Sequence, residues 1–189
     1  MNSVKLFVLS VAAIYLLGTP MAHAQAKEGE KAKTAGAVVG TWTLVSEVAH
    51  QGEKTMLPLG PNPLGSIMLD PGGHFILMIA RPDLPKFAGN KRDAGTPEEN
   101  KAVLAGSLAF FGTYSINEVE NVLTLHPEAS TFPNWIGVDQ KRYCTVAGDE
   151  MKWTNRTPAI GAEFVELVWK RAPLATLRPD NKDVLRESR

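Results

Sequence analysis

The sequence predicts an all-β fold, an eight-stranded antiparallel up-and-down β-barrel with one inserted short α-helix. Runs of β-prone residues recur at intervals of about 8 to 12 residues after residue 38. Short connections rich in Gly, Pro, Asn and Asp join most of these runs, as in β-hairpins. Only one internal segment carries helix signals. Sequential antiparallel strands can close into a barrel, which removes both exposed sheet edges.

Composition narrows the possible functions. The 189 residues carry 20 Lys+Arg against 20 Asp+Glu, so the formal net charge is +0 and no basic patch for nucleic acid is expected. The single Cys144 cannot form an intrachain disulfide. No C-x-x-C motif or His/Cys cluster with zinc spacing occurs, and no phosphate loop or dinucleotide fingerprint follows a strand. We therefore expect no metal and no cofactor.

Residues 1–24 are typical of a signal peptide. Lys5 precedes an apolar run from Leu6 to Leu17, which is shorter than the about 20 residues of a membrane-spanning helix. Ala22-His23-Ala24 matches the small-x-small pattern of a cleavage site. We expect cleavage after Ala24, export to the periplasm or the medium, and no integral membrane segment in the mature protein. An uncleaved anchor is the alternative.

Two further segments lie outside the predicted barrel. Residues 25–37 are mainly Ala, Lys, Glu and Gly without hydrophobic periodicity, which predicts a disordered tether. Residues 38–172 hold the strand signals, and residues 173–189 form a C-terminal tail. No recognition motif for a protein partner is visible in either segment.

The first strand is expected over Gly40 to Ala49, where side chains alternate between two faces. Trp42, Leu44, Ser46 and Val48 share one face, whereas Thr41, Thr43, Val45 and Glu47 share the other. The remaining strands are expected at Leu64 to Leu69, His74 to Ala80, Phe111 to Asn117, Val122 to His126, Gln140 to Ala147, Met151 to Arg156 and Ala162 to Lys170.

One helix is inserted before the strand at Phe111. Thr96 is a suitable N-cap, Pro97 fits the first helical position, and Glu98 and Glu99 complement the positive end of the helix dipole. The helix is expected to end near Ala109. Its apolar residues are mostly small, which predicts a position against the outside of the sheet or across one end.

The two ends of the predicted barrel carry a familiar pair of motifs. Gly40-Thr41-Trp42 opens the first strand and Trp169-Lys170-Arg171 closes the last. This pair resembles the signature of the lipocalin and calycin barrels. The resemblance implies that Arg171 packs across the Trp42 ring in a cation–π contact that closes the barrel floor. Both residues would then have a structural role.

A longer set of motifs covers most of the chain. The ordered set is Gly40-Thr41-Trp42 with Leu44-Val45-Ser46, Pro58-Leu59-Gly60, Arg81-Pro82, Ala94-Gly95-Thr96-Pro97-Glu98-Glu99, Phe111-Gly112-Thr113-Tyr114 and Phe132-Pro133-Asn134-Trp135-Ile136-Gly137. This set is similar to the bacterial and fungal lipocalin-like domain family, from about Val39 to Arg171. The resemblance implies a barrel that binds a small apolar ligand, by association with the fold.

Arg142 is the first candidate for a ligand contact. On the strand from Gln140, alternation places Gln140, Arg142, Cys144 and Val146 on the face expected to point inward. A buried guanidinium needs a carboxylate, carbonyls or a bound anion. It would anchor an acidic head group, as in fatty-acid-binding barrels that are distant relatives of this fold. The alternatives are an ion pair with Glu166 or a strand that faces the other way.

His126 is the second candidate, because histidine titrates near neutral pH. With Tyr114 on the neighbouring strand and Arg142, Asn134 and Trp135, it would line one pocket mouth. The alternative is a hydrogen-bonded histidine at a strand end. The aromatic connection from Pro127 to Val138 is expected to cover the open end as a lid.

Three functions are compatible with these residues. The first is an exported carrier of a small, mainly hydrophobic molecule with Arg142, His126, Tyr114, Trp135, Asn134 and Gln140 as ligand contacts. The second is a barrel enzyme, a cyclase, isomerase or dehydratase, in which His126 is the acid/base and Arg142 stabilises negative charge. The third is a filled barrel that binds a protein through a patch around Trp135. Cys144 is expected to be a small buried hydrophobe rather than a nucleophile.

Overall fold

The structure, a computed structural model, describes residues 34–173, which form one antiparallel sheet with a few short helices. The order of strands in the sheet is β2-β1-β3-β4-β5-β6-β7-β8-β9, and β1 also pairs with β9. The elements are α2 (Thr34–Val38), β1 (Gly40–Gln51), β2 (Lys54–Met56), β3 (Leu64–Leu69), β4 (His74–Ala80), α3 (Pro97–Gly106), β5 (Ser107–Asn117), β6 (Val122–Ser130), a 3-10 helix (Pro133–Trp135), β7 (Gln140–Ala147), β8 (Glu150–Asn155) and β9 (Phe164–Arg171).

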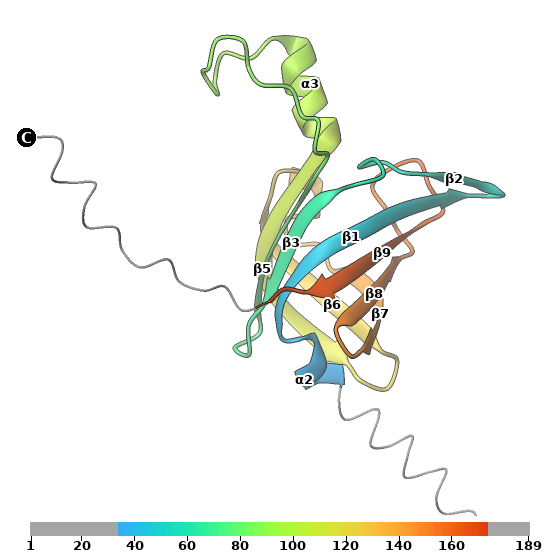
Figure 1. Ribbon diagram of the computed structural model, residues 1–189. Coiled ribbons are helices and arrows are strands. Elements are labelled where there is room, and N and C mark those ends of the chain that lie inside the picture. Colours follow the sequence, from blue (N-terminus) through green and yellow to red (C-terminus); the bar gives the residue numbers. More distant parts are fainter. Residues whose placement is uncertain (1–33, 174–189) are drawn as a thin grey trace, which may run out of the picture.

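The predicted eight-stranded barrel is confirmed, with β2 as an additional strand. Pairing of β1 with β9 closes the sheet along almost the whole length of both strands. β2 pairs only with the end of β1, and all three of its residues are exposed. This local hairpin therefore projects beyond the barrel in Figure 1. The sequence did not predict it, because so short a strand buries no face.

Several boundaries agree with the prediction, but the region around α3 differs. β3, β4 and β7 begin and end where alternation placed them. The capping box is present, since Glu99 N donates to Thr96 Oγ1 at 3.2 Å and Thr96 N donates to Glu99 Oε2 at 2.8 Å. However, α3 ends at Gly106 rather than near Ala109, and β5 begins at the next residue. The expected end of the helix was therefore wrong.

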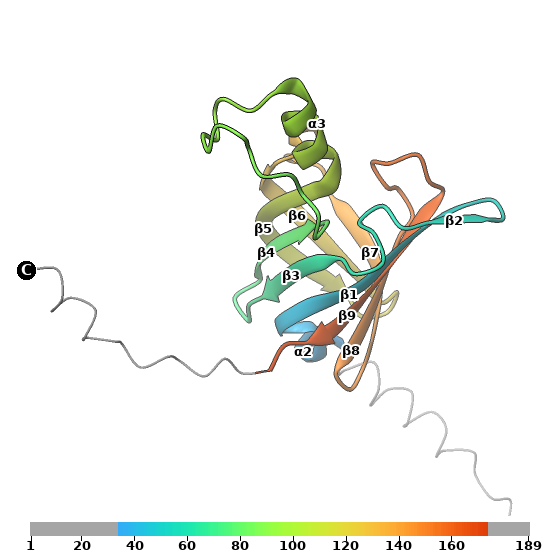
Figure 2. The same cartoon turned by 45° about the horizontal axis from the view of Figure 1, so that its top comes forward.

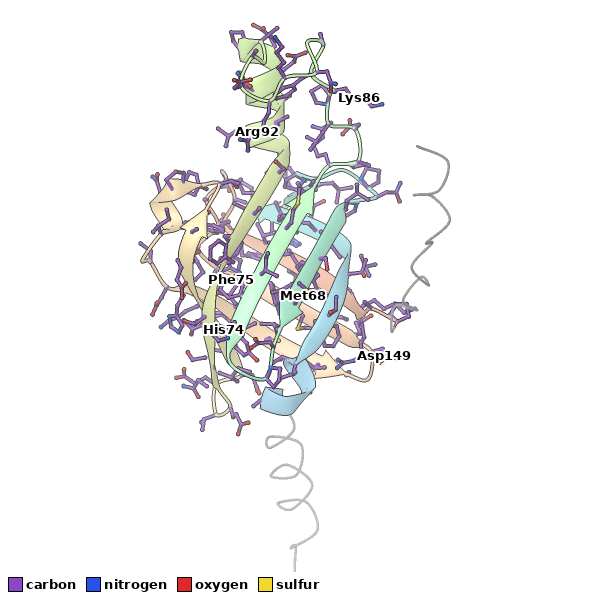
Figure 3. All side chains as sticks on the ribbon, turned by 90° about the vertical axis from the view of Figure 1, so that its left-hand side faces the viewer. Met68, His74, Phe75, Lys86, Arg92 and Asp149 are labelled. Atoms are coloured by element: carbon purple, nitrogen blue, oxygen red, sulfur yellow. The ribbon has the colours of Figure 1, made fainter. Side chains whose placement is uncertain are left out.

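The two ends of the barrel are built differently. Figures 1 and 2 show α2 at one end and α3 with β2 at the other. α3 stands beyond the rim on the extension of β5, not against the side of the sheet. The loop that carries Lys86 and Arg92 lies beside α3, as Figure 3 shows. Of the two predicted positions for this helix, the structure has it at one end of the barrel.

The floor of the barrel is closed as the resemblance implied. The Arg171 guanidinium lies 4.1 Å from the centre of the Trp42 ring, and Trp42 is fully buried. Arg171 also donates to the carbonyls of Ala37 and Val39 at 2.8 and 2.9 Å. Gly40 has φ +132°, and a Cβ there would lie 2.8 Å from Arg171 Nη1. The glycine of the first motif therefore makes room for the arginine of the last.

A β-bulge in β1 reverses the alternation of inward and outward side chains. Leu44 pairs with Trp169 but Ser46 pairs with Val168, so one extra β1 residue, Val45, is inserted. Before the bulge Trp42 and Leu44 point inward, and after it Glu47 does so. The prediction that Glu47 lies on the face opposite Trp42 and Leu44 was wrong. Regular alternation cannot anticipate an inserted residue.

Other expectations concern the ends of the chain. Residues 34–37 belong to α2, so the end of the expected tether is helical. The signal peptide, the cleavage site after Ala24, the rest of the tether and most of the C-terminal tail lie outside the described residues. Among residues 34–173 no helix is long and apolar enough to cross a membrane.

Candidate functional site

The barrel holds a cavity of about 330 Å³ at the end that carries α3. This volume lies in the range of small-molecule pockets. Most lining side chains are apolar, and they come from strands, from α3 and from the loops at this end. The lining residues are Glu47, Pro58, Leu59, Leu77, Ile79, Leu104, Ala105, Ser107, Leu108, Phe110, Thr131, Phe132, Trp135, Arg142, Trp153, Asn155, Pro158, Ala159, Ile160, Val165 and Leu167.

Arg142 points into this cavity from β7. It is 4% exposed, its Nη1 donates to the Lys141 carbonyl at 2.8 Å, and its guanidinium lies 5.6 Å from the centre of the Trp135 ring. Burial lowers the pKa of Arg142 to about 10, which leaves it cationic at neutral pH. The alternative partner Glu166 instead contacts His50 at 3.0 Å on the outer surface. An ion pair between Arg142 and Glu166 is therefore ruled out.

Glu47 is a second ionisable group in the same cavity. It is 8% exposed, and its Oε2 has no hydrogen-bond partner among the described residues. Burial raises the pKa of Glu47 to about 7, because the low-dielectric surroundings disfavour the carboxylate. No ion pair of the described residues includes Glu47 or Arg142. The cavity thus contains two buried groups of opposite charge type that do not neutralise each other directly.

Aromatic side chains form one wall at the mouth. Trp135, in the 3-10 helix, packs edge to face on Phe110 at 5.2 Å between ring centres, and Phe132 packs on Trp135 at 5.9 Å. Phe110 in turn contacts Phe75 at 5.4 Å. The β6–β7 connection therefore places its two large aromatics at the cavity, where the lid was expected. It is shorter than expected, since β6 continues to Ser130.

Four of the six predicted ligand contacts are not among the residues that line the cavity. Tyr114 donates its hydroxyl to the Asp70 carbonyl at 2.6 Å, in the turn near the floor. Gln140 is buried, and its Nε2 donates to the Val138 carbonyl at 3.2 Å. Asn134 is exposed on the 3-10 helix. Only Arg142 and Trp135 of the predicted set meet at the cavity.

His126, the fourth, lies on the outer face of the barrel. Its Nε2 is 3.0 Å from Ser115 Oγ, and its Nδ1 is 2.7 Å from Asp139 Oδ1. The spacing is that of a nucleophile, a base and an orienting carboxylate. None of the three residues lines the cavity, so the predicted pocket mouth does not contain the proposed acid/base. This arrangement agrees with the alternative of a hydrogen-bonded histidine.

Cys144 lies in the barrel interior. It is 2% exposed, and burial raises the pKa of its thiol to about 12. Such a thiol is not a nucleophile at neutral pH. Among residues 34–173 no group of three or more His, Cys, Asp or Glu side chains is placed to hold a metal ion.

Sequence reasoning missed two buried polar residues of the cavity, Glu47 and Asn155. Asn155 continues the alternation of Met151 and Trp153 on β8, and all three are buried. That pattern was available in the sequence and would have identified it. Glu47 had no comparable signal, because the bulge at Val45 changes its face.

The comparisons with known proteins agree with this architecture. Residues 39–172 match the model of the lipocalin-like domain family. The chain is also 26% identical over 107 residues to the 4′-hydroxy-3′-methoxypropiophenone carrier protein of Aspergillus oryzae. That alignment covers 52% of this chain and 96% of the fungal protein.

Proposed function

The chain belongs to the lipocalin-like domain family, and from this premise we propose that it is a carrier that holds a small, mainly hydrophobic molecule in its barrel cavity. The observation that carries the proposal is the cavity of about 330 Å³, with buried Arg142 behind an aromatic mouth. Apolar burial against such a wall supplies affinity, and a few placed polar groups orient the ligand.

Arg142 is the proposed polar anchor of that ligand. A guanidinium has five N–H donors, and one of these is used by the Lys141 carbonyl. The Trp135 ring covers part of the cation but supplies no hydrogen-bond acceptor. A ligand oxygen would therefore satisfy donors that have been removed from water. This gain would offset the cost of burying the charge.

The fungal relative supports the same reading. Its name describes it as a carrier of 4′-hydroxy-3′-methoxypropiophenone, which is an aryl ketone. A compact aromatic molecule of this kind suits a cavity bordered by Phe110, Phe132 and Trp135. We propose that the ligand of this chain is of similar size and is also mainly apolar.

We propose export as the setting of this function. The apolar run before Ala22-His23-Ala24 supports it. Mass spectrometry of the intact protein from its own host should give the mass of the chain that begins at Gln25. A full-length chain in the cell extract, with none outside the cytoplasm, would contradict export.

Native mass spectrometry tests the carrier directly. Protein purified from its own host should retain a small molecule that organic extraction removes. The Arg142→Met variant should retain much less of it, whereas Lys141→Met, on the outer face of the same strand, should retain as much as the wild type. The proposal fails if no adduct is present and a panel of fluorescent aromatic and fatty-acid probes does not bind.

A further inference from the structure

Glu47 and Arg142 reach the cavity from different sides of the barrel wall. Glu47 lies on β1 and Arg142 on β7, with β9 and β8 between them in the closed sheet. Three strand steps of about 4.8 Å separate their backbones by roughly 14 Å along the sheet. Most of the other residues that line the cavity are apolar, so a ligand that contacts both side chains carries two polar groups on a mainly apolar body.

The charges of the cavity indicate what those groups are. Glu47 and Arg142 are the two side chains in its lining that carry an ionisable acid or base. Glu166, on the strand next to β1, points outward and contacts His50. The charges of one carboxylate and one guanidinium cancel, so the net charge of the cavity stays at zero when a neutral ligand binds. A ligand carboxylate would instead give the occupied cavity a net negative charge when Glu47 is ionised.

The hydrogen-bonding capacity of the two residues completes the argument. Glu47 Oε2 is a buried acceptor that no group among residues 34–173 satisfies, so it suits a ligand hydroxyl that donates to it. Arg142 has donors to spare and suits a carbonyl oxygen. Resting on the carrier function proposed above, we propose that the ligand is a neutral hydroxy-carbonyl compound, whose hydroxyl is bound by Glu47 and whose carbonyl is bound by Arg142. In this proposal the ligand group that Arg142 binds is a carbonyl, and not the acidic head group expected from the sequence.

A matched pair of probes tests this assignment. Calorimetric titration at pH 8 should show that 4′-hydroxypropiophenone binds about 10-fold or more tightly than propiophenone, as expected for a hydrogen bond to a charged group. Glu47→Leu should reduce this preference to within about 2-fold, and Glu47→Gln should retain part of it because an amide still accepts a hydrogen bond. Arg142→Met should weaken the binding of both ketones.

Glu166→Gln is the control, because it removes a carboxylate on the neighbouring strand outside the cavity. It should leave the hydroxyl preference unchanged. Thermal unfolding of each variant verifies that it is folded before binding is compared.

Three results would overturn the assignment. The first is a hydroxyl preference that survives in Glu47→Leu, and the second is tighter binding of 4-hydroxybenzoate than of 4′-hydroxypropiophenone. The third is binding of neither ketone to the wild-type protein. In each case the carrier function is judged separately, by whether native mass spectrometry finds a co-purifying molecule.

Discussion

Glu47 lies in surroundings that disfavour a carboxylate. A carboxylate normally lies in water or beside a cation. Glu47 is instead buried in a mainly apolar cavity, and its Oε2 has no hydrogen-bond partner in the described part of the chain. Arg142 is similarly placed, with one backbone carbonyl as its hydrogen-bond partner. Two such groups in one site cost stability unless something else satisfies them. We interpret the two groups as polar contacts for a ligand, which would satisfy them when it is bound.

The ligand-free protein should lose stability as pH rises because of Glu47. Its folded pKa of about 7 exceeds the ordinary value of 4.5, so the folded state holds the proton more tightly than the unfolded state. The penalty is absent below pH 4.5, grows through the interval up to about pH 7 and then levels off at about 3 kcal/mol. Urea unfolding of extracted protein at pH 5 and pH 8 should show this difference in the wild type but not in Glu47→Gln. Equal pH dependence in both proteins would contradict it.

The predictability of single residues followed the regularity of their strands. Arg142 was placed correctly because β7 alternates without interruption and its other inward residue Cys144 is apolar. Glu47 was misplaced because one inserted residue, Val45, reverses the faces. His126 was placed at the cavity on its chemistry alone, whereas β6 turns Leu123 and Leu125 inward and His126 outward. The chemistry of histidine made His126 a candidate, but the alternation of side chains along β6 places it on the outer face.

Among the elements, the β6–β7 connection has the clearest role. Its 3-10 helix positions Trp135 next to both Phe110 and Arg142. The Trp135 ring therefore lines the cavity and also contacts the Arg142 guanidinium. Asn134 is its exposed neighbour in the same helix. Substituting each residue in turn therefore distinguishes a contribution of the Trp135 ring to the cavity from a contribution of the β6–β7 connection as a whole.

Trp135→Ala should weaken ligand binding by about 10-fold or more and lower the free energy of unfolding by about 1 to 2 kcal/mol. The reason is the loss of its ring contacts with Phe110 and Phe132 and of the cation–π contact with Arg142. Calorimetric titration and urea unfolding measure the two effects. Asn134→Ala should change neither. Equal effects of both substitutions would contradict a specific role of Trp135, because any change in the connection would then alter affinity and stability to the same extent.

The elements that could be predicted were those with long, regular alternation or strong turn signals. β3 and β4 flank a Pro-Gly-Gly turn, and β7 alternates from end to end. The start of α3 was predicted by its N-cap threonine, its first-turn proline and its acidic first turn. Its end was not, because Ser107 to Ala109 are small or apolar and suit either structure. β2 is too short and too exposed to leave a pattern.

The barrel combines an open end that holds the cavity with a floor closed by side chains. Closure depends on pairing between the first and last barrel strands. Arg171 also donates to the carbonyl of Ala37 in α2 and to that of Val39, which follows α2. The barrel and its floor were predictable, because the G-x-W motif and Arg171 mark the two ends of the barrel in the sequence. Whether the interior was hollow was not, since inward side chains either fill space or line it.

Arg171→Met should lower the free energy of unfolding by about 2 to 4 kcal/mol, because it removes the contact with Trp42 and two hydrogen bonds to backbone carbonyls. Lys170→Met, at an exposed position next to it, should have little effect. Urea unfolding provides the comparison. Ligand affinity should be unchanged while the variant is folded, since the floor lies at the far end from the cavity. A loss of affinity without a loss of stability would contradict this separation.

The same bonds to Ala37 and Val39 bring residues 34 and 173, where the described chain begins and ends, to the floor of the barrel. A fusion partner or a solid support joined near either of these residues would therefore hold the protein with its mouth directed away from the attachment. The fold thus keeps its attachment points apart from its cavity.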